Sequence, residues 1–135
     1  METKDVPGSD FLGEEQWKWL EQVLSDSKAD MIVLGSGVQF LQNYRVIFTE
    51  GWHRHEKARF LDLIEKLRLN RVFIVSGDIH FYQHYQSACP IGGPAGYYLY
   101  ESTSSGLSHV ATTYIPLADH FAQVLSPRTY PISNL

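Results

Sequence analysis

An aspartate and a histidine follow the most apolar strand that the sequence predicts. Residues 72–75 are four apolar residues in a row, a run typical of a strand buried on both faces in a parallel sheet. The run stops near Gly77, and Asp78 and His80 come directly after it. If the chain stays extended through Ile79, both side chains leave the same side of the backbone and converge on one point.

A carboxylate oxygen and an imidazole nitrogen placed in this way suit a divalent or trivalent transition metal. In open α/β sheets, ligands bind just beyond the carboxyl ends of the strands, which is where Asp78 and His80 are expected to lie. Two ligands do not define a metal site, however. The alternative is that Asp78 caps a backbone N–H and His80 is a polar residue leaving the strand.

A second loop is expected at the same edge of the sheet. Residues 30–34 read as another buried strand, and a long aromatic-rich connection over residues 38–55 follows it. Loops of this length in compact domains are usually functional. Because strands 30–34 and 71–76 are expected to be parallel, segment 49–55 should border the cleft that holds the aspartate and the histidine.

The second loop carries candidate substrate-binding residues. We expect Trp52 to form a wall of the cleft and Arg54 to face a phosphate group. His53 and His55 could chelate a metal from a strand, but no third ligand is spaced with them. We therefore favour the alternative, in which both histidines face solvent or cap the helix that follows.

Apolar periodicity and capping residues predict two helices, over residues 14–26 and 56–69. Asn70 is expected to close the second helix in a left-handed conformation. Together with the strands at 30–34 and 71–76, the second helix should form a right-handed βαβ unit. The expected fold class is therefore α/β.

The later part of the chain carries weaker signals. A third strand is expected over residues 97–101, with a polar turn over residues 102–106 beyond it. His80 and His84 have the i,i+4 spacing of a helical zinc pair, but no glutamate stands beside the first histidine as in zincins. From His109 onward, three prolines break the apolar pattern.

The composition limits the class of protein. A length of 135 residues suits one domain, and 44% hydrophobic residues are ordinary for a globular fold. A net charge of −4 argues against general nucleic-acid binding. The single Cys89 cannot form an internal disulfide. No apolar run is long enough for a transmembrane helix, and residues 1–10 read as a polar arm without the regions of a signal peptide.

Five motifs then resemble a known family. They are Leu12-Gly13-Glu14-Glu15-Gln16-Trp17-x-Trp19-Leu20, Gly35-Ser36-Gly37-Val38-Gln39, Glu50-Gly51-Trp52, Ser76-Gly77-Asp78-Ile79-His80-Phe81 and Tyr100-Glu101-Ser102-Thr103-Ser104-Ser105-Gly106-Leu107-Ser108-His109. In this order they resemble the C-terminal half of a PhoD-like alkaline phosphatase, a branch of the calcineurin-like metallophosphoesterases. Residues 11–135 are accordingly interpreted as the C-terminal portion of such a domain.

The resemblance implies a fold, an activity and cofactors. The fold would be part of an α/β/β/α sandwich, and the activity would be hydrolysis of phosphate mono- or diesters at a two-metal centre. Iron and calcium are implied as metals, with zinc or manganese as alternatives. Asp78 and His80 would be metal ligands by the same resemblance.

The chain also departs from the family pattern. The family's earlier metal motifs belong upstream of these residues, and His53-Arg54-His55-Glu56 stands where members tend to carry Pro-x-x-Arg. A two-metal centre needs more ligands than one loop supplies. Two hypotheses follow: a phosphoesterase portion completed by a missing N-terminal half, or a non-catalytic α/β interaction module that is a truncated or degenerate relative.

Overall fold

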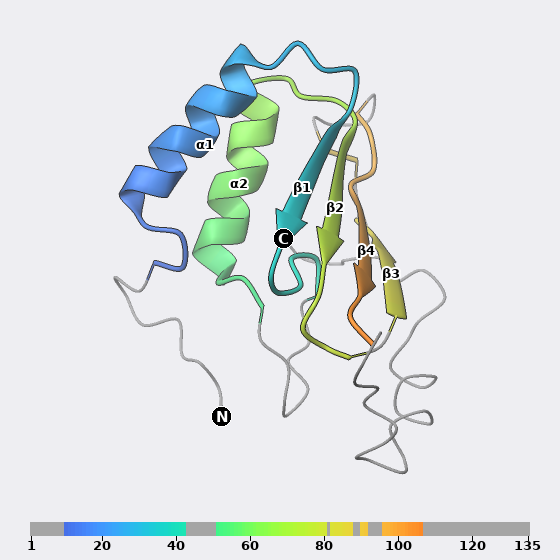
Figure 1. The fold of residues 1–135 in the computed structure, drawn as a ribbon. Helices are drawn as coiled ribbons and strands as arrows, with labels where there is room; N and C mark the ends of the chain where they lie inside the picture. The colour runs from blue at the N-terminus through green and yellow to red at the C-terminus, as the bar shows by residue number, and fades with distance from the viewer. Residues whose placement is uncertain (1–9, 43–50, 81, 88–89, 92–95, 107–135) are drawn as a thin grey trace.

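A computed structural model describes residues 10–42, 51–80, 82–87, 90–91 and 96–106 of the chain. Its elements are the helices α1 (Glu14–Asp26) and α2 (Arg54–Lys66) and the strands β1 (Ile32–Ser36), β2 (Val72–Ser76), β3 (Tyr82–Gln86) and β4 (Tyr100–Ser104). Both helices pack on one face of the sheet (Figure 1). The α/β class expected from the sequence is confirmed.

The four strands form one mixed sheet in the order β1-β2-β4-β3. β2 pairs in parallel with β1 on one side and with β4 on the other, and β3 runs antiparallel to β4 at the edge. The expected parallel pairing of the first two strands is confirmed, since Ile32 pairs with Val72 and Ser36 with Ser76. The chain between them contains α2, so β1, α2 and β2 form a βαβ crossover.

The helix predictions hold with different boundaries for the second helix. α1 spans the expected residues, with Glu14 and Glu15 in its first turn. α2 begins two residues earlier and ends three residues earlier than expected. The left-handed residue is Arg68, with φ 51°, so the assignment of this conformation to Asn70 is wrong.

A Schellman motif ends α2, which explains the earlier boundary. The backbone N–H of Arg68 donates to the carbonyl of Glu65 at 3.0 Å, and the N–H of Leu69 donates to the carbonyl of Ile64 at 3.0 Å. These two bonds satisfy carbonyl groups at the helix end that no further helical turn would reach. The motif therefore closes the helix before the asparagine.

The expected polar turn over residues 102–106 is wrong for its first three residues. Residues 102–104 continue β4 instead of forming a polar turn, and His84 lies in β3, so its spacing from His80 is not helical. The reason is that Glu101 and Thr103, which look like loop residues, are fully buried on the helix side of the sheet. The segment from His109 onward lies outside the described residues.

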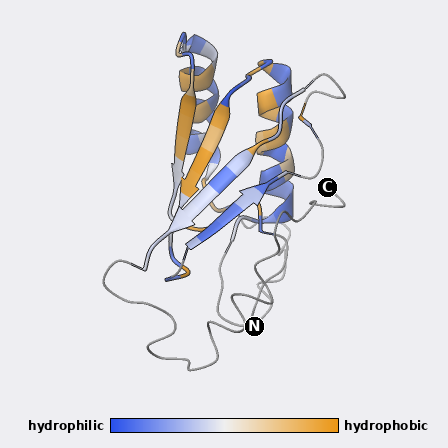
Figure 2. Ribbon diagram, turned by 90° about the vertical axis from the view of Figure 1, so that its right-hand side faces the viewer, coloured by the Kyte–Doolittle hydropathy of each residue, from blue (hydrophilic) through white to orange (hydrophobic). Residues whose placement is uncertain are grey.

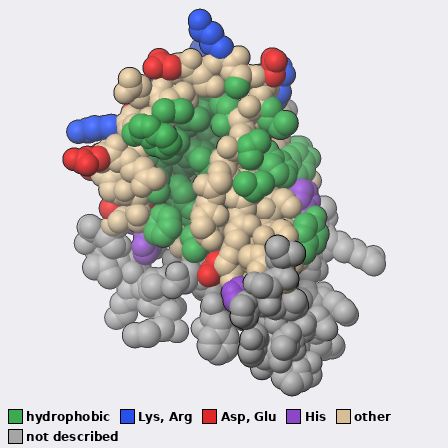
Figure 3. All heavy atoms as spheres, in the orientation of Figure 1, with side chains coloured by type: hydrophobic (Ala, Val, Ile, Leu, Met, Phe, Trp, Pro, Cys, Tyr) green, Lys and Arg blue, Asp and Glu red, His purple; other side chains and the backbone are tan. Residues whose placement is uncertain are grey.

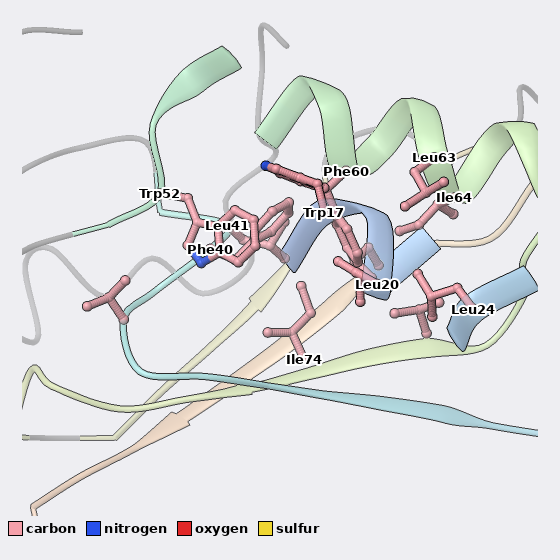
Figure 4. Close-up of a cluster of buried hydrophobic side chains, with 13 residues drawn as sticks. Trp17, Leu20, Leu24, Phe40, Leu41, Trp52, Phe60, Leu63, Ile64 and Ile74 are labelled. Atoms are coloured by element: carbon pink, nitrogen blue, oxygen red, sulfur yellow. The ribbon is translucent and has the colours of Figure 1, made fainter. Parts of the chain in front are cut away.

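The core lies between the sheet and the helices, and aromatic rings dominate its centre (Figure 4). Trp52 contacts four aromatic rings, with centroid distances of 5.7 Å to Phe11, 6.2 Å to Trp17, 5.1 Å to Phe40 and 6.1 Å to Phe60. Each buried aromatic side chain stabilises the fold by removing a large apolar area from water. This cluster fixes both helices to the chain that follows β1.

Hydropathy changes across the sheet. In Figure 2 the strands β1 and β2 are hydrophobic, whereas β4 is close to neutral and β3 is hydrophilic. β1 and β2 therefore have the apolar composition that is typical of strands in a parallel sheet, and β3 has the polar character of an exposed edge strand. No helix in the described part of the chain has the length and apolar character needed to cross a membrane.

A buried carboxylate fastens the start of α1 to the start of α2. Glu56 is 1% exposed, and its Oε1 accepts the backbone N–H groups of Phe11 at 2.9 Å and Leu12 at 3.1 Å. Asp10 lies against the same carboxyl group and accepts the indole N–H of Trp17 at 3.3 Å. Burial and the contact with Asp10 raise the pKa of Glu56. The hydrogen bond between the two carboxyl groups lowers the pKa of Asp10.

The Glu56 carboxyl group should make stability depend on pH. A raised pKa in the folded state means that the proton binds the fold more tightly than the unfolded chain. The stabilising contribution of Glu56 to the folded state is fully present at pH values below 4.5, the ordinary pKa of glutamate. It is lost as the pH rises through the raised pKa of the folded state. Glu56→Gln mimics the protonated form, so we expect its Tm to exceed that of the parent chain near neutral pH and to match it in acid.

Thermal denaturation followed by circular dichroism between pH 4 and 8 measures this difference. Glu65→Gln, an exposed carboxylate on the same helix, is the matched control and should follow the parent chain at every pH. A difference in Tm between Glu56→Gln and the parent chain that stays constant across the pH range would contradict the assignment of the pH dependence to Glu56.

Candidate functional site

Three loops meet at one edge of the sheet because β1, β2 and β4 are parallel. Gly37 follows β1, Gly77 follows β2 and Ser105 follows β4. A Cβ atom added at Gly77 would lie 3.6 Å from the carbonyl oxygen of Gly37 and 3.6 Å from the Cβ of Ser105. The carboxyl ends of the strands are therefore held in contact, as expected for the ligand-binding edge of an α/β sheet.

The predicted metal ligands lie at this edge. Asp78 and His80 are exposed, and Ile79 between them is buried with 7% exposure. β2 ends at Ser76, so the chain is not extended through Ile79. Asp78 and His80 instead have positive φ angles of 78° and 58°.

Left-handed backbone at two non-glycine residues of one short turn costs energy, on the order of 1–3 kcal/mol each. Such strain persists where the surrounding structure holds it, and it concentrates at functional sites. Here the N–H of His80 donates to the hydroxyl oxygen of Ser105 at 2.9 Å, and the N–H of Ile79 donates to the carbonyl of Gly77 at 3.1 Å. The bond to Ser105 fastens the strained turn to the end of β4, and the bond to Gly77 closes the turn itself.

The donor set at this edge is partial. Among the described residues, no three histidine, cysteine, aspartate or glutamate side chains gather closely enough to hold a metal ion. One carboxylate and one imidazole are chemically suited to a transition metal, but a two-metal centre requires more ligands. Asp78 and His80 can therefore form one part of a metal site.

Trp52 lies in the core beneath this edge rather than on an open surface. It is 5% exposed, and its indole N–H donates to the hydroxyl oxygen of Ser36 at 3.0 Å. The Ser36 hydroxyl in turn donates to the carbonyl of Val38 at 2.6 Å. Trp52 thus braces the glycine-rich loop after β1, and a direct contact with substrate stays a prediction.

Residues 53–55 of the same segment lie at the start of α2. Arg54 is the exposed first residue of that helix, and His53 is its N-cap residue without a side-chain capping bond. The rings of His53 and His55 stack with centroids 5.6 Å apart. Glu50 lies outside the described residues.

A buried polar network under the same edge was missed from the sequence. Glu101 Oε1 accepts the N–H of Phe40 at 2.8 Å and the hydroxyl of Ser76 at 2.6 Å, and its Oε2 accepts the N–H of Leu41 at 2.6 Å. The Ser76 and Thr103 hydroxyl oxygens are 2.7 Å apart. Residues 101–104 are all polar, so β4 lacks the alternation of apolar and polar residues that would identify its buried face from the sequence.

The network continues through two glutamines into the edge strand. The amide nitrogen of Gln39 donates to Thr103 Oγ1 at 3.0 Å and to Gln83 Oε1 at 2.9 Å. The hydroxyl of Tyr85 also donates to Gln83, and burial raises the pKa of Tyr85 to about 12, so this donor keeps its proton at physiological pH. The helix side of the sheet therefore becomes polar toward the carboxyl edge.

Comparison with known proteins agrees with this arrangement. The sequence model of a family described as PhoD-like phosphatase matches residues 1–115. A solved structure described as "Structure of PhoD" matches with a TM-score of 0.61 and 21% sequence identity, and the match covers 76% of this chain. The chain spans only 22% of that solved chain. No curated protein sequence matches this chain.

The Trp52 brace should contribute measurably to stability. Trp52→Phe keeps an aromatic ring in the core but removes the N–H that Ser36 accepts and part of the buried volume. We expect a loss of about 1–3 kcal/mol in the free energy of unfolding. Urea denaturation measures this loss, with Trp19→Phe as control because Trp19 is 58% exposed. Equal losses in the two variants would contradict the assignment of Trp52 to the core.

Proposed function

Because the chain belongs to the PhoD-like phosphatase family, we propose that it forms part of a metal-dependent phosphoesterase site, with Asp78 and His80 as metal ligands. The supporting observation is the strained turn that places both donors, exposed, at the carboxyl edge of the sheet. The proposed reaction is hydrolysis of phosphate mono- or diesters at two metal ions. Iron and calcium are the metals we propose, with zinc and manganese as alternatives.

Bound metal ions would polarise a phosphoryl oxygen and lower the pKa of a water molecule. The role of this chain is to hold donors in position. Ser105 restrains the backbone of His80, and Gly77 leaves room for the loops after β1 and β4 to approach. Arg54 presents an exposed guanidinium group, and we propose it as a contact for a substrate phosphate.

We further propose that a missing N-terminal half of the domain supplies the remaining ligands. Two observations support this: the chain spans 22% of the solved PhoD chain, and the described residues contain only a partial donor set. This half would also cover apolar surface. In register across the sheet, the face opposite the helices presents Val33, Phe73, Val75 and Tyr100.

Several apolar side chains on this face of the sheet are exposed to solvent. Val33 is 57% exposed, Val75 is 40% exposed and Tyr100 is 38% exposed. In the view of Figure 3, hydrophobic side chains also reach the surface in several groups, while most charged side chains lie toward the margins. Parallel sheets bury both faces, so an uncovered apolar face favours association with a further layer.

The uncovered face should make the 135-residue chain self-associate. The double substitution Val33→Lys and Val75→Lys places charge on this face. We therefore expect the double variant to sediment as a monomer at concentrations where the parent chain forms oligomers. Sedimentation velocity measures the difference. Val23→Lys changes a 44% exposed residue on α1 and should leave the association unchanged. Persistent oligomers in the double variant would show that another surface mediates them.

Activity provides the direct test of the proposal. Assayed alone with a chromogenic phosphoester and iron, calcium, zinc or manganese, the chain should show little or no hydrolysis, because two ligands hold an ion weakly and cannot hold a second one. Joined to an upstream half that carries the missing carboxylates, it should hydrolyse the ester. Asp78→Asn should then abolish turnover, whereas Asp62→Asn on the exposed side of α2 should not.

Two results would reject the proposal in different ways. Turnover by the joined protein that survives Asp78→Asn would remove this residue from the metal site. A joined protein that binds no metal and hydrolyses no ester would favour the non-catalytic interaction module instead.

A further inference from the structure

We infer that Glu101 is a positioning residue, a buried carboxylate that fixes the chain after β1 and the Asp78–His80 turn relative to each other. This inference rests on the proposed function only for its effect on turnover. Its structural content stands on the contacts of Glu101 alone. The carboxylate comes from β4, yet it bonds to Ser76 at the end of β2 and to Phe40 and Leu41 in the segment after β1.

Glu101 forms hydrogen bonds to two separate segments of the chain. Glu101 accepts the two consecutive backbone N–H groups of Phe40 and Leu41, one with each oxygen, at 2.8 and 2.6 Å. It also accepts the hydroxyl of Ser76 at 2.6 Å. All three bonds are short, so Glu101 ties the segment after β1 to the end of β2.

This arrangement has an energetic cost. Glu101 is 0% exposed and pairs in register with Ile74, a residue of the apolar core. No described lysine or arginine forms an ion pair with it. Burying a carboxylate costs free energy, and among the described residues its hydrogen bonds are what offset this cost. Stability alone is therefore a poor explanation for a carboxylate at this position.

Glu101 is connected to the candidate site through Ser76. Ser76 is the last residue of β2, and Gly77 and Asp78 follow it directly. On the other side, Phe40 continues the loop whose Gly37 carbonyl approaches Gly77. Glu101 therefore bonds to both segments whose relative position decides where Asp78 and His80 stand.

The network also extends away from the carboxylate. Through Ser76 and Thr103 the hydroxyl chain reaches Gln39, and through Gln39 it reaches Gln83 of β3. Gln39 Oε1 is buried without a hydrogen-bond partner within the described part of the chain. A network that leaves one buried acceptor unsatisfied is not arranged for stability alone, which agrees with a positioning role.

Glu101→Gln tests the inference in the 135-residue chain without reference to catalysis. The glutamine has the same shape, but its amide group places a donor against the backbone N–H of Phe40 or Leu41. We expect these two amides to exchange hydrogen about tenfold faster or more, relative to amides of α1. We also expect the NMR signals of residues 77–80 to shift, because the end of β2 that precedes them is held by Glu101.

Ile64→Val is the matched control, because it loosens the buried core without touching the network. It should change exchange uniformly and leave the signals of residues 77–80 in place. If Glu101→Gln does not fold, Ser76→Ala provides a milder break, since it removes one bond and leaves both backbone bonds to the carboxylate. The turn signals should still shift in Ser76→Ala.

Unchanged relative exchange at Phe40 and Leu41, or unmoved signals at residues 77–80, would overturn the inference whatever the joined protein does. In that joined protein, Glu101→Gln should lower kcat while the bound metal content stays constant, and Ile64→Val should not. An inactive joined protein with shifted turn signals would reject the proposed function and leave the positioning role supported.

Discussion

The parallel pairing of β2 with both β1 and β4 is the constraint on which the rest of the structure depends. Parallel neighbours end at the same edge of the sheet, so three loops that are far apart in the sequence become adjacent. The glycine after β2 permits their close approach, and Ser105 restrains the backbone of His80. An antiparallel arrangement of the same strands would have placed these loops at opposite edges.

The core beneath the sheet has two halves with different chemistry. Near the middle, aromatic and aliphatic side chains such as Trp52, Phe60 and Ile74 fill the space between sheet and helices. Toward the carboxyl edge, Glu101 and Thr103 replace them with hydrogen-bonding groups. The apolar half supplies most of the stability, and the polar half defines direction, because hydrogen bonds depend on angle and apolar contacts do not.

The chain belongs to the PhoD-like phosphatase family and covers a small part of a solved PhoD chain. The family model matches most of the chain, whereas the chain spans only 22% of the solved PhoD chain with the similar fold. The partial donor set and the exposed apolar face of the sheet both agree with the proposal that a further part of the domain supplies ligands and covers the sheet. The donor set concerns metal ligands and the apolar face concerns the packing of the sheet, so the two observations are independent of each other.

The sequence by itself determined the elements whose signal is local. The apolar run of β2, the capping pattern of α1 and the Gly-Asp-x-His turn could all be identified because each depends on neighbouring residues. The tertiary structure alone decided what Glu101 and Trp52 do. Their roles depend on partners 16 to 61 residues away in the chain. A polar residue in a strand and a tryptophan in a loop have the same local pattern whether they face solvent or a distant backbone amide.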